Sequence, residues 1–223
     1  MLLRADFGQR VVVTPDQYEW VPSPVAGVER MMLDRVGDEV ARATSIVRYA
    51  PNSQFPPHEH SGGEEILVLA GEFADEHGSY PAGSYLRNPI GTSHRPSVGP
   101  EGATIFVKLR QFDTADSRQA AIDTNTGGWQ PSRAEGVELM PLHKHGSEQI
   151  ALIRFSPDTV YPTHVHEGGE EILVLRGEFR DAHGEYPQGS WMRYPDRSEH
   201  EVTSGPDGAL LYVKIGHLSD CSE

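Results

Sequence analysis

Residues 58–73 read HEHSGGEEILVLAGEF, and residues 164–179 read HVHEGGEEILVLRGEF. Both stretches belong to a longer internal repeat, because residues 58–108 and 164–214 align without a gap and share 29 of 51 residues. A repeat of about one hundred residues has the size of a small domain. The sequence therefore indicates a tandem duplication.

The repeat continues upstream with a different offset. EWVPSPVAGVE at residues 19–29 aligns with GWQPSRAEGVE at residues 128–138. We therefore predict two domains, residues 1–117 and 118–223. Between them, residues 112–127 are polar and lack strand alternation, which predicts a linker or a short helix.

Each copy shows the pattern of an all-β domain. EEILVLAGEF is a short apolar run that ends near Gly71, and turn residues such as Pro81 and Gly83 recur about every 8–12 positions. This spacing is typical of a sandwich or a barrel. No segment has a long apolar period of 3.6 residues, so we expect little helix.

The pattern His-x-His-x3-Glu, followed by a distant His, occurs once in each copy. On a strand, residues i and i+2 face the same side, so the paired histidines point into one space. The Gly-Gly pair that follows permits a tight turn, which returns the glutamate opposite them. A barrel interior then allows the distant histidine to reach the same point. The predicted ligand sets are His58, His60, Glu64 and His94, and His164, His166, Glu170 and His200.

Three imidazoles and one carboxylate are suited to a divalent transition metal. Imidazole suits Zn, Cu, Fe and Ni, and the carboxylate extends the choice to Mn. A single histidine pair on a strand is usually a surface feature. Here the whole set recurs at unchanged spacing while neighbours such as Glu59 and Val165 differ. This recurrence predicts a metal site in each copy.

Four other charged residues recur close to these ligands. Arg87 and Arg193 lie on the strand before the last histidine, and they are predicted to orient the ligand glutamate or to hold an anionic ligand. Glu65 and Glu171 face the opposite side of their strand by alternation. For all four residues, a surface ion pair is the alternative to a supporting role at the metal site. No catalytic residue is assigned.

The composition excludes several function classes. Nineteen Lys and Arg against 33 Asp and Glu give a net charge of −14, which argues against nucleic acid and anionic membranes as partners. The first residues show no apolar run of the kind found in signal peptides, and no apolar stretch of about 18 residues occurs, so we expect a cytoplasmic protein. Its one cysteine, Cys221, excludes an intramolecular disulfide.

The ligand spacing resembles the cupin superfamily, whose motifs are G-x5-H-x-H-x3/4-E-x6-G and G-x5-P-x-G-x2-H-x3-N. The first motif matches from His58 to Gly71, and the second from Gly83 to His94. This resemblance implies an all-β fold of two tandem cupin barrels, each a double-stranded β-helix or jelly roll. Such a chain is an intramolecular version of a cupin dimer, and further homodimerisation stays open.

The sequence departs from the cupin motifs at three turn positions. Asn52 and Asp158 replace the opening glycine, and both residue types tolerate a left-handed conformation. Arg197 replaces the glycine before His200. We expect the turn at Arg197 to differ in shape and the second site to be more open.

Within the cupins, RATSIVRYAP and HEHSGGEEILVL are similar to the cupin domain of ChrR-type anti-sigma factors. Those regulators release a sigma factor under oxidative stress. The resemblance implies zinc at the His-His-Glu-His site, with Fe, Mn and Ni as alternatives. Their inhibitory half is a separate helical domain with a His-x3-Cys-x2-Cys motif, which this chain lacks. We therefore do not expect a sigma factor as partner.

Three hypotheses follow for the function. The first is a metal-binding sensory protein that takes up a small ligand or a reactive oxygen species at the metal. The second is a metal-dependent dioxygenase or related enzyme with a small organic substrate. The third is structural zinc without chemistry, since four protein ligands are usual in closed zinc sites.

Overall fold

The computed structural model describes residues 1–218, and the regular secondary structure of this range is almost entirely strand. It contains no α-helix, and its two 3-10 turns are η1 (Pro15–Gln17) and η2 (Thr124–Thr126). The all-β prediction is therefore confirmed. No helix in the described range is long and apolar enough to cross a membrane. Cys221 lies outside the described residues.

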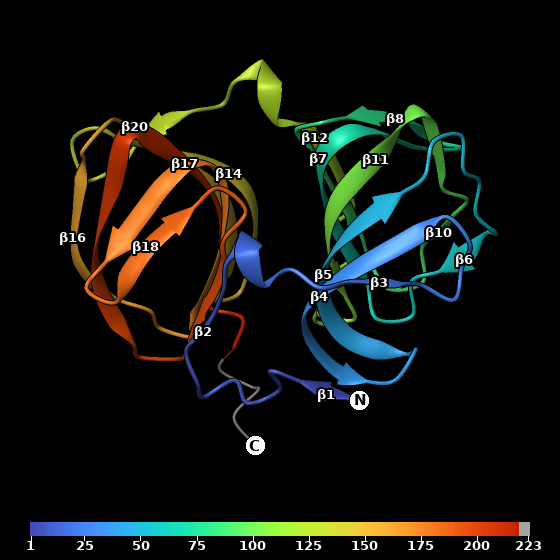
Figure 1. The fold of residues 1–223 in the computed structure, drawn as a ribbon, viewed down its shortest axis with the longest axis horizontal. Helices are drawn as coiled ribbons and strands as arrows, with labels where there is room; N and C mark the ends of the chain where they lie inside the picture. Colours follow the sequence, from blue (N-terminus) through green and yellow to red (C-terminus); the bar gives the residue numbers. More distant parts are fainter. Residues whose placement is uncertain (219–223) are drawn as a thin grey trace. The chain divides into compact units, whose positions relative to one another are not determined.

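The chain divides into two compact units, each a rolled antiparallel sheet (Figure 1). The N-terminal unit combines Met1–Ala5 with Glu19–Thr126. The C-terminal unit combines Asp6–Tyr18, here called the exchanged arm, with the described residues from Gly127 onward.

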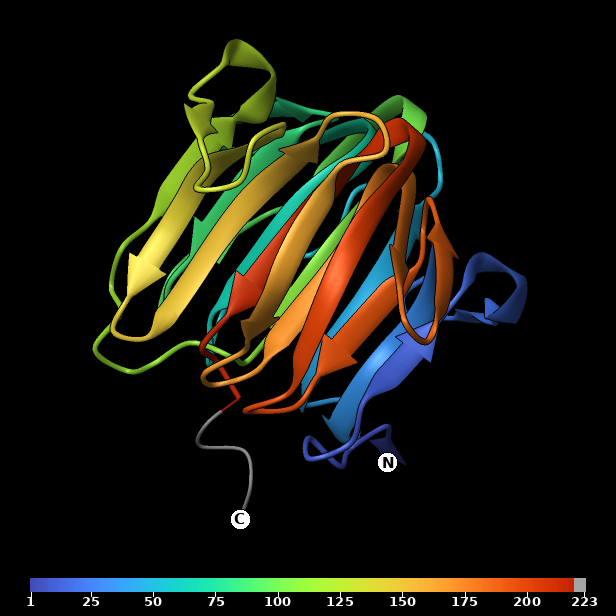
Figure 2. The ribbon, with the colours of Figure 1, turned by 90° about the vertical axis from the view of Figure 1, so that its left-hand side faces the viewer.

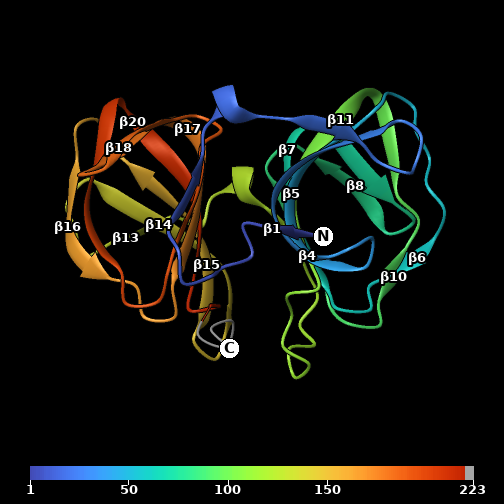
Figure 3. The ribbon, with the colours of Figure 1, turned by 60° about the horizontal axis from the view of Figure 1, so that its bottom comes forward.

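The N-terminal unit is built around one large sheet. Its strand order is β1 (Leu2–Leu3), β4 (Val28–Gly37), β5 (Ala41–Tyr49), β11 (Ser97–Leu109), β7 (Glu64–Asp75), β9 (Ser84–Asn88) and β12 (Ala120–Asp123). Two short strands extend it, β3 (Trp20–Pro22) on β4 and β8 (Gly78–Pro81) on β7. A separate ribbon pairs β6 (His58–Glu59) with β10 (Ser93–His94), as Figure 3 shows.

The C-terminal unit repeats this arrangement. Its strand order is β13 (Gln130–Pro131), β14 (Val137–His145), β15 (Glu148–Phe155), β20 (Glu199–Ile215), β17 (Glu170–Asp181), β19 (Trp191–Tyr194) and β2 (Val11–Val13). Strand β16 (Val160–Val165) pairs with β20, and β18 (Gly184–Pro187) pairs with β17. Figure 2 shows the long strands of this unit curving as they pair.

Each sheet encloses its own apolar core, because alternate residues of its strands point inward. In the N-terminal unit, Ile66 and Val68 of β7 are about 1% exposed and pack against the aromatic ring of Phe73. In the C-terminal unit, Ile172 and Val174 occupy the equivalent positions. The repeated run EEILVL therefore supplies the centre of both cores.

The two repeats exchange one short strand. Val11–Val13 and Ala120–Ile122 are equivalent in the upstream alignment. Strand β12 pairs with β9 of the N-terminal unit, whereas β2 pairs with β19 of the C-terminal unit. Each unit thus completes its sheet with the strand that precedes the other repeat (Figure 1).

Because of the exchange, strands β2 and β12 belong to units other than those predicted from the sequence. The predicted boundary between residues 117 and 118 lies just before β12 and assigns this strand to the second domain, whereas β12 pairs with β9 of the N-terminal unit. The linker prediction for residues 112–127 is wrong at Ala120–Asp123, which forms a strand. This strand escapes a pattern search because it is short and contains only one large apolar residue, Ile122.

The residue types at the turn positions of the motif are explained by backbone conformation and close contacts. A Cβ on Gly71 would lie 2.0 Å from the carbonyl oxygen of Gly102, and Gly71 has a φ of +69°. Only glycine fits such a close approach of two strands. Asn52 and Asp158 are left-handed as expected, with φ of 58° and 50°. Arg197 also takes the left-handed conformation, with φ of 61°, so the second turn keeps the backbone form of a glycine.

Substituting Val13 by aspartate is expected to lower the free energy of unfolding of the C-terminal unit by at least about 2 kcal/mol. Val13 is 1% exposed and lies opposite Trp191 in the β2–β19 pair. The substitution removes a buried apolar side chain and puts a charge in its place. Urea unfolding would measure the loss. Val160→Asp is the matched control, since Val160 is 50% exposed, and an equal loss in both variants would contradict the prediction.

Candidate metal centres

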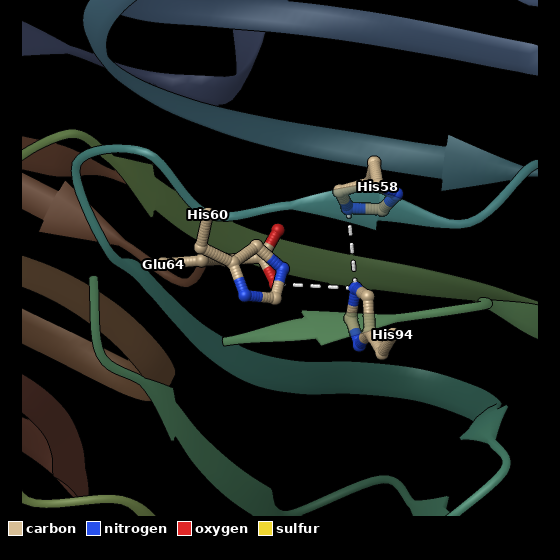
Figure 4. Close-up of side chains that lie close together, drawn as sticks. All are labelled: His58, His60, Glu64 and His94. Carbon is tan, nitrogen blue, oxygen red and sulfur yellow. Dashed lines mark hydrogen bonds and ion pairs between the residues drawn. The ribbon is translucent and has the colours of Figure 1, made fainter. Parts of the chain in front are cut away.

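The first histidine–glutamate cluster lies where β6, β7 and β10 meet. His58 belongs to β6, and its partner across the ribbon is His94 of β10. His60 follows β6, and the turn through Gly63, whose φ is +78°, leads to Glu64 at the start of β7. Figure 4 shows the four side chains gathered around one centre. The structure thus brings together all four ligands predicted for the first copy.

The separations between the donor atoms fit one metal ion. His60 Nε2 lies 3.2 Å and His94 Nε2 lies 3.5 Å from Glu64 Oε2. His94 Nε2 lies 3.2 Å from His58 Nε2. Ligand atoms about 2.0–2.2 Å from a metal, at tetrahedral or octahedral angles, lie about 2.9–3.5 Å apart. The cluster therefore has the size of a metal coordination sphere.

Hydrogen bonds on the other ring nitrogens aim the lone pairs at this centre. The hydroxyl of Thr92 donates to Pro89 O at 2.7 Å, so it accepts from His60 Nδ1 at 2.9 Å. The other two Nδ1 atoms face a backbone carbonyl and a carboxylate, which can accept a hydrogen bond but cannot donate one. With Nδ1 protonated, each Nε2 is left with a free lone pair. The two contacts are His58 Nδ1 to Pro56 O at 3.4 Å and His94 Nδ1 to Asp75 Oδ2 at 3.2 Å.

Three of the four donors are buried, and one is exposed. His60, Glu64 and His94 have exposed fractions of 6, 7 and 3%, whereas His58 is exposed to solvent. The buried Nε2 of His60 has no hydrogen-bond partner among the described residues. A buried imidazole nitrogen without a partner is costly unless a cation uses it. This residue set therefore fits a divalent metal that is reached from the side of His58.

Burial alone would raise the pKa of Glu64. The nearby imidazoles of His60 and His94 nevertheless hold its pKa below the ordinary value. The side-chain amide of Asn88 also donates to Glu64 Oε2 at 3.1 Å. Burial lowers the pKa of His94, which favours its neutral form. An ionised carboxylate and neutral imidazoles are the states that bind a metal.

The second cluster repeats this design in the C-terminal unit. His166 Nε2 and His200 Nε2 lie 3.1 and 3.4 Å from Glu170 Oε2. The hydroxyl of Ser198 takes the place of Thr92 and accepts from His166 Nδ1 at 2.9 Å. His164 is half-buried, and its Nδ1 contacts Pro162 O at 3.0 Å. All four ligands predicted for the second copy are therefore brought together as well.

The two clusters differ in what lies next to the last histidine. Tyr194 stands where the first unit has Asn88, and its hydroxyl donates to Asp181 Oδ2 at 2.9 Å instead of reaching Glu170. The ring of Tyr194 packs edge-on against His200, with centroids 4.6 Å apart. His200 Nδ1 is 3.8 Å from Asp181 Oδ2, and it makes no hydrogen bond to a described residue.

Burial lowers the pKa of His166 to about 4. Between this value and the ordinary 6.5, the unfolded chain binds a proton that the folded chain does not. We therefore expect the metal-free protein to lose stability as the pH falls from about 6.5 to about 4. Urea unfolding at a series of pH values, with His166→Gln as the comparison, would measure this. A variant that keeps the full pH dependence would contradict the assignment to His166.

The structure places the four charged neighbours away from the metal centres. Glu65 faces the opposite side of β7 from Glu64, and it pairs with Arg87 Nη1 at 3.5 Å. Arg87 also contacts Asp116, and its guanidinium stacks on the ring of Phe112. These contacts form a buried ion-pair network in place of the expected surface ion pair, and none of them involves Glu64. Strand alternation is the physical reason, because β9 pairs Arg87 directly with Glu65.

The equivalent residues of the C-terminal unit contact the exchanged arm and the sheet. Arg193 donates to the carbonyl oxygen of Asp6 at 2.9 Å and stacks on Phe7. Glu171 accepts from the Trp191 indole at 2.8 Å. Neither residue reaches the second cluster through these contacts.

Sequence reasoning missed the acceptor residues that lie beside the Nδ1 atoms of the ligand histidines. Asp75 and Asp181 recur at the repeat offset, and a hydroxyl recurs at Thr92 and Ser198. Their recurrence was a usable signal, but turn residues also recur for backbone reasons. Arg10 contacts Asp181 from the exchanged arm, and nothing in the repeat pointed to it, because the aligned residue is Gln119.

Comparison of the structure with solved proteins gives cupin-type folds along most of the chain. A suggested dioxygenase from Nostoc punctiforme superposes with a TM-score of 0.79 at 18% identity, covering 97% of this chain and 85% of that one. The oxalate decarboxylase–formate complex of Lactobacillus farciminis has a TM-score of 0.65 at 11% identity, with 96 and 88% covered. A pirin from Escherichia coli in complex with nickel(II) has a TM-score of 0.65 at 14% identity, with 93 and 99% covered.

No curated protein matches the chain by sequence. The sequence model of the ChrR cupin-like domain matches twice, over residues 8–113 and 117–219. These two matches contain both metal-ligand clusters and both rolled sheets. The chain thus belongs to the ChrR cupin-like domain family and carries two copies of that domain.

Proposed function

We propose that each unit binds one divalent transition metal, with zinc as the first candidate, and that a small ligand binds to this metal from the solvent side. The observation that carries the proposal is the uneven burial of the donor set. Three donors are buried and fixed, and the fourth, His58 or His164, lies toward solvent. A closed structural site needs no such access.

The residues around the metal would hold the ligand histidines in place in this function. Pro56 O, Thr92 and Asp75 fix the histidine rings, so the metal keeps its geometry while a ligand enters. A bound divalent metal would act as a Lewis acid toward an oxygen atom of the ligand. Carboxylates and peroxides are therefore the ligand classes to examine first.

Elemental analysis of protein purified without an affinity tag tests metal binding, and we expect two metal ions per chain. Titration of the cobalt-substituted protein with small carboxylates and with peroxide then tests the ligand. A change in the cobalt absorption spectrum would support the proposal. The variant Glu64→Ala with Glu170→Ala controls for adventitious metal. Absence of bound metal in the unmodified chain, or no change of the cobalt spectrum with any ligand, would refute the proposal.

A metal-dependent oxygenase is the second candidate, and the aromatic lining of the first site favours it. Phe73 packs against His94 with ring centroids 5.9 Å apart, and Tyr49 adjoins Phe73 and Phe55. Such a lining suits an apolar organic substrate beside the metal. The name of the Nostoc punctiforme neighbour suggests the same reaction class.

Oxygen uptake by the iron-loaded protein, with a panel of diketones and phenols, distinguishes the two candidates. The oxygenase requires uptake that depends on substrate and is lost in His60→Ala with His166→Ala. Ligand binding without oxygen uptake would leave the sensory function. Metal that stabilises the fold but neither binds ligand nor supports uptake would indicate structural zinc.

A further inference from the structure

The two metal centres differ in one supporting carboxylate. In the N-terminal unit, Asp75 Oδ1 accepts from the backbone N–H of His77 at 2.8 Å and from the hydroxyl of Tyr80 at 3.3 Å. Its other oxygen, Oδ2, contacts His94 Nδ1 at 3.2 Å. One carboxylate oxygen is therefore assigned to the metal-ligand histidine.

In the C-terminal unit the equivalent oxygen is shared. Asp181 Oδ1 accepts from the N–H of His183 and from the Tyr186 hydroxyl, both at 2.7 Å. Asp181 Oδ2 accepts from Tyr194 at 2.9 Å and pairs with Arg10 Nη2 at 3.4 Å. His200 Nδ1 is left 3.8 Å away, beyond hydrogen-bond distance.

Arg10 reaches this carboxylate because the exchanged arm pairs with β19. Its guanidinium hydrogen-bonds to the Tyr186 hydroxyl and lies 5.3 Å from the ring centroid of Tyr194. In the N-terminal unit the equivalent strand β12 brings Gln119 instead, which is exposed and uncharged. Among the described residues, Arg10 forms an ion pair with the supporting carboxylate of the second unit, whereas Arg95 lines the same pocket as Asp75 without pairing with it.

A carboxylate that accepts from a ligand histidine makes the opposite ring nitrogen a better metal donor, and removing such a partner lowers metal affinity by about 10–100-fold. Arg10 and Tyr194 withdraw this support from His200. Arg10 also adds a positive charge near the site of a divalent cation. We infer that the second site binds metal more weakly than the first, and that Arg10 of the exchanged arm is the positioning residue that sets this difference.

This inference rests on the proposed metal binding and adds that the two sites hold their metal with different affinities. The first site keeps its metal, and the second site exchanges its metal at lower free concentrations of a competing chelator. The arm that sets the second affinity comes from the other repeat. Metal occupancy of the second site is therefore coupled to the docking of residues 6–18.

Single-site chains allow the two affinities to be measured separately. His164→Ala with His166→Ala leaves the first site, and His58→Ala with His60→Ala leaves the second. Competition of each chain with a chromophoric chelator for Zn²⁺ gives the dissociation constants. We expect the first site to bind Zn²⁺ at least about tenfold more tightly.

Substitutions in the second-site chain then test Arg10 itself. Arg10→Gln is expected to tighten Zn²⁺ binding about tenfold, whereas Arg10→Lys keeps the charge and the weak binding. Tyr194→Phe removes the other donor to Asp181 Oδ2 and is also expected to tighten binding. Arg154→Gln is the matched control, since it removes a positive charge that pairs with Glu138, away from the cluster.

Equal affinities of the two single-site chains would overturn the inference and leave the proposed metal binding intact. Unchanged or weaker Zn²⁺ binding in Arg10→Gln would overturn the role of Arg10. Absence of Zn²⁺ binding in both single-site chains would overturn the proposed function together with the inference. Circular dichroism of each variant confirms that the affinities refer to folded protein.

Discussion

Replacing Arg87 by alanine is expected to lower the free energy of unfolding of the N-terminal unit by about 3–5 kcal/mol. Arg87 is fully buried and contacts Glu65 and Asp116, whose side chains are 2 and 5% exposed. Removing the guanidinium leaves these two buried carboxylates without that counter-charge. Removing one partner costs far more free energy than the ion pair contributes, because water cannot solvate the buried carboxylates that remain.

Urea unfolding of Arg87→Ala measures this effect, and Arg180→Ala is the control. Arg180 is 38% exposed and pairs with a partly exposed Glu178, so its loss is expected to cost less than about 1 kcal/mol. A second comparison is Arg87→Ala combined with Glu65→Gln, which removes one of the stranded charges and is expected to regain part of the stability. Equal stability of Arg87→Ala and Arg180→Ala would show that the buried network is not needed.

Loading of the two metal sites is expected to raise the free energy of unfolding by about 4 kcal/mol per site when free metal exceeds the dissociation constant about a thousandfold. The metal binds the folded chain because only folding brings Nε2 of His60 and Nε2 of His94 within 3.5 Å of Glu64 Oε2. Unfolding in the presence of metal and of a strong chelator measures the difference.

The double variant Glu64→Gln and Glu170→Gln serves as the control for this prediction. It keeps the size of both side chains but removes the charge from both donor sets, so the stabilisation by metal should be largely lost. If chelation left the stability of the unmodified chain unchanged, the clusters would not bind metal. If the double variant responded like the unmodified chain, the metal would bind elsewhere.

Much of the site could be predicted from sequence because its geometry is local. Residues 58 and 60 are two apart in an extended pattern, which predicts that they face the same side, and the Gly62–Gly63 turn fixes where Glu64 returns. The repeat then supplied a second, independent copy of the same pattern. The role of Arg87 was not predictable in this way, because its partner Asp116 lies in a segment without strand pattern.

The strand exchange could not be predicted from the sequence because the two repeats are equivalent. Each repeat contains one copy of the added strand and one copy of the edge that receives it. Pairing within a repeat and pairing across repeats therefore bring equivalent side chains together: β12 meets Tyr85 and Arg87, and β2 meets Trp191 and Arg193. Only the length and path of the connecting segments distinguish the two, and periodicity carries no information on them.

The strand exchange also imposes an order on biosynthesis. The N-terminal unit has all its strands once residue 123 has left the ribosome. The partner of strand β2, Trp191–Tyr194, is made nearly 180 residues after β2 itself. Pairs this distant in sequence form slowly, and an unpaired strand is prone to wrong partners. The edge of β9 offers such a partner until β12 covers it, so we expect synthesis of residues 120–123 to limit wrong pairing of β2.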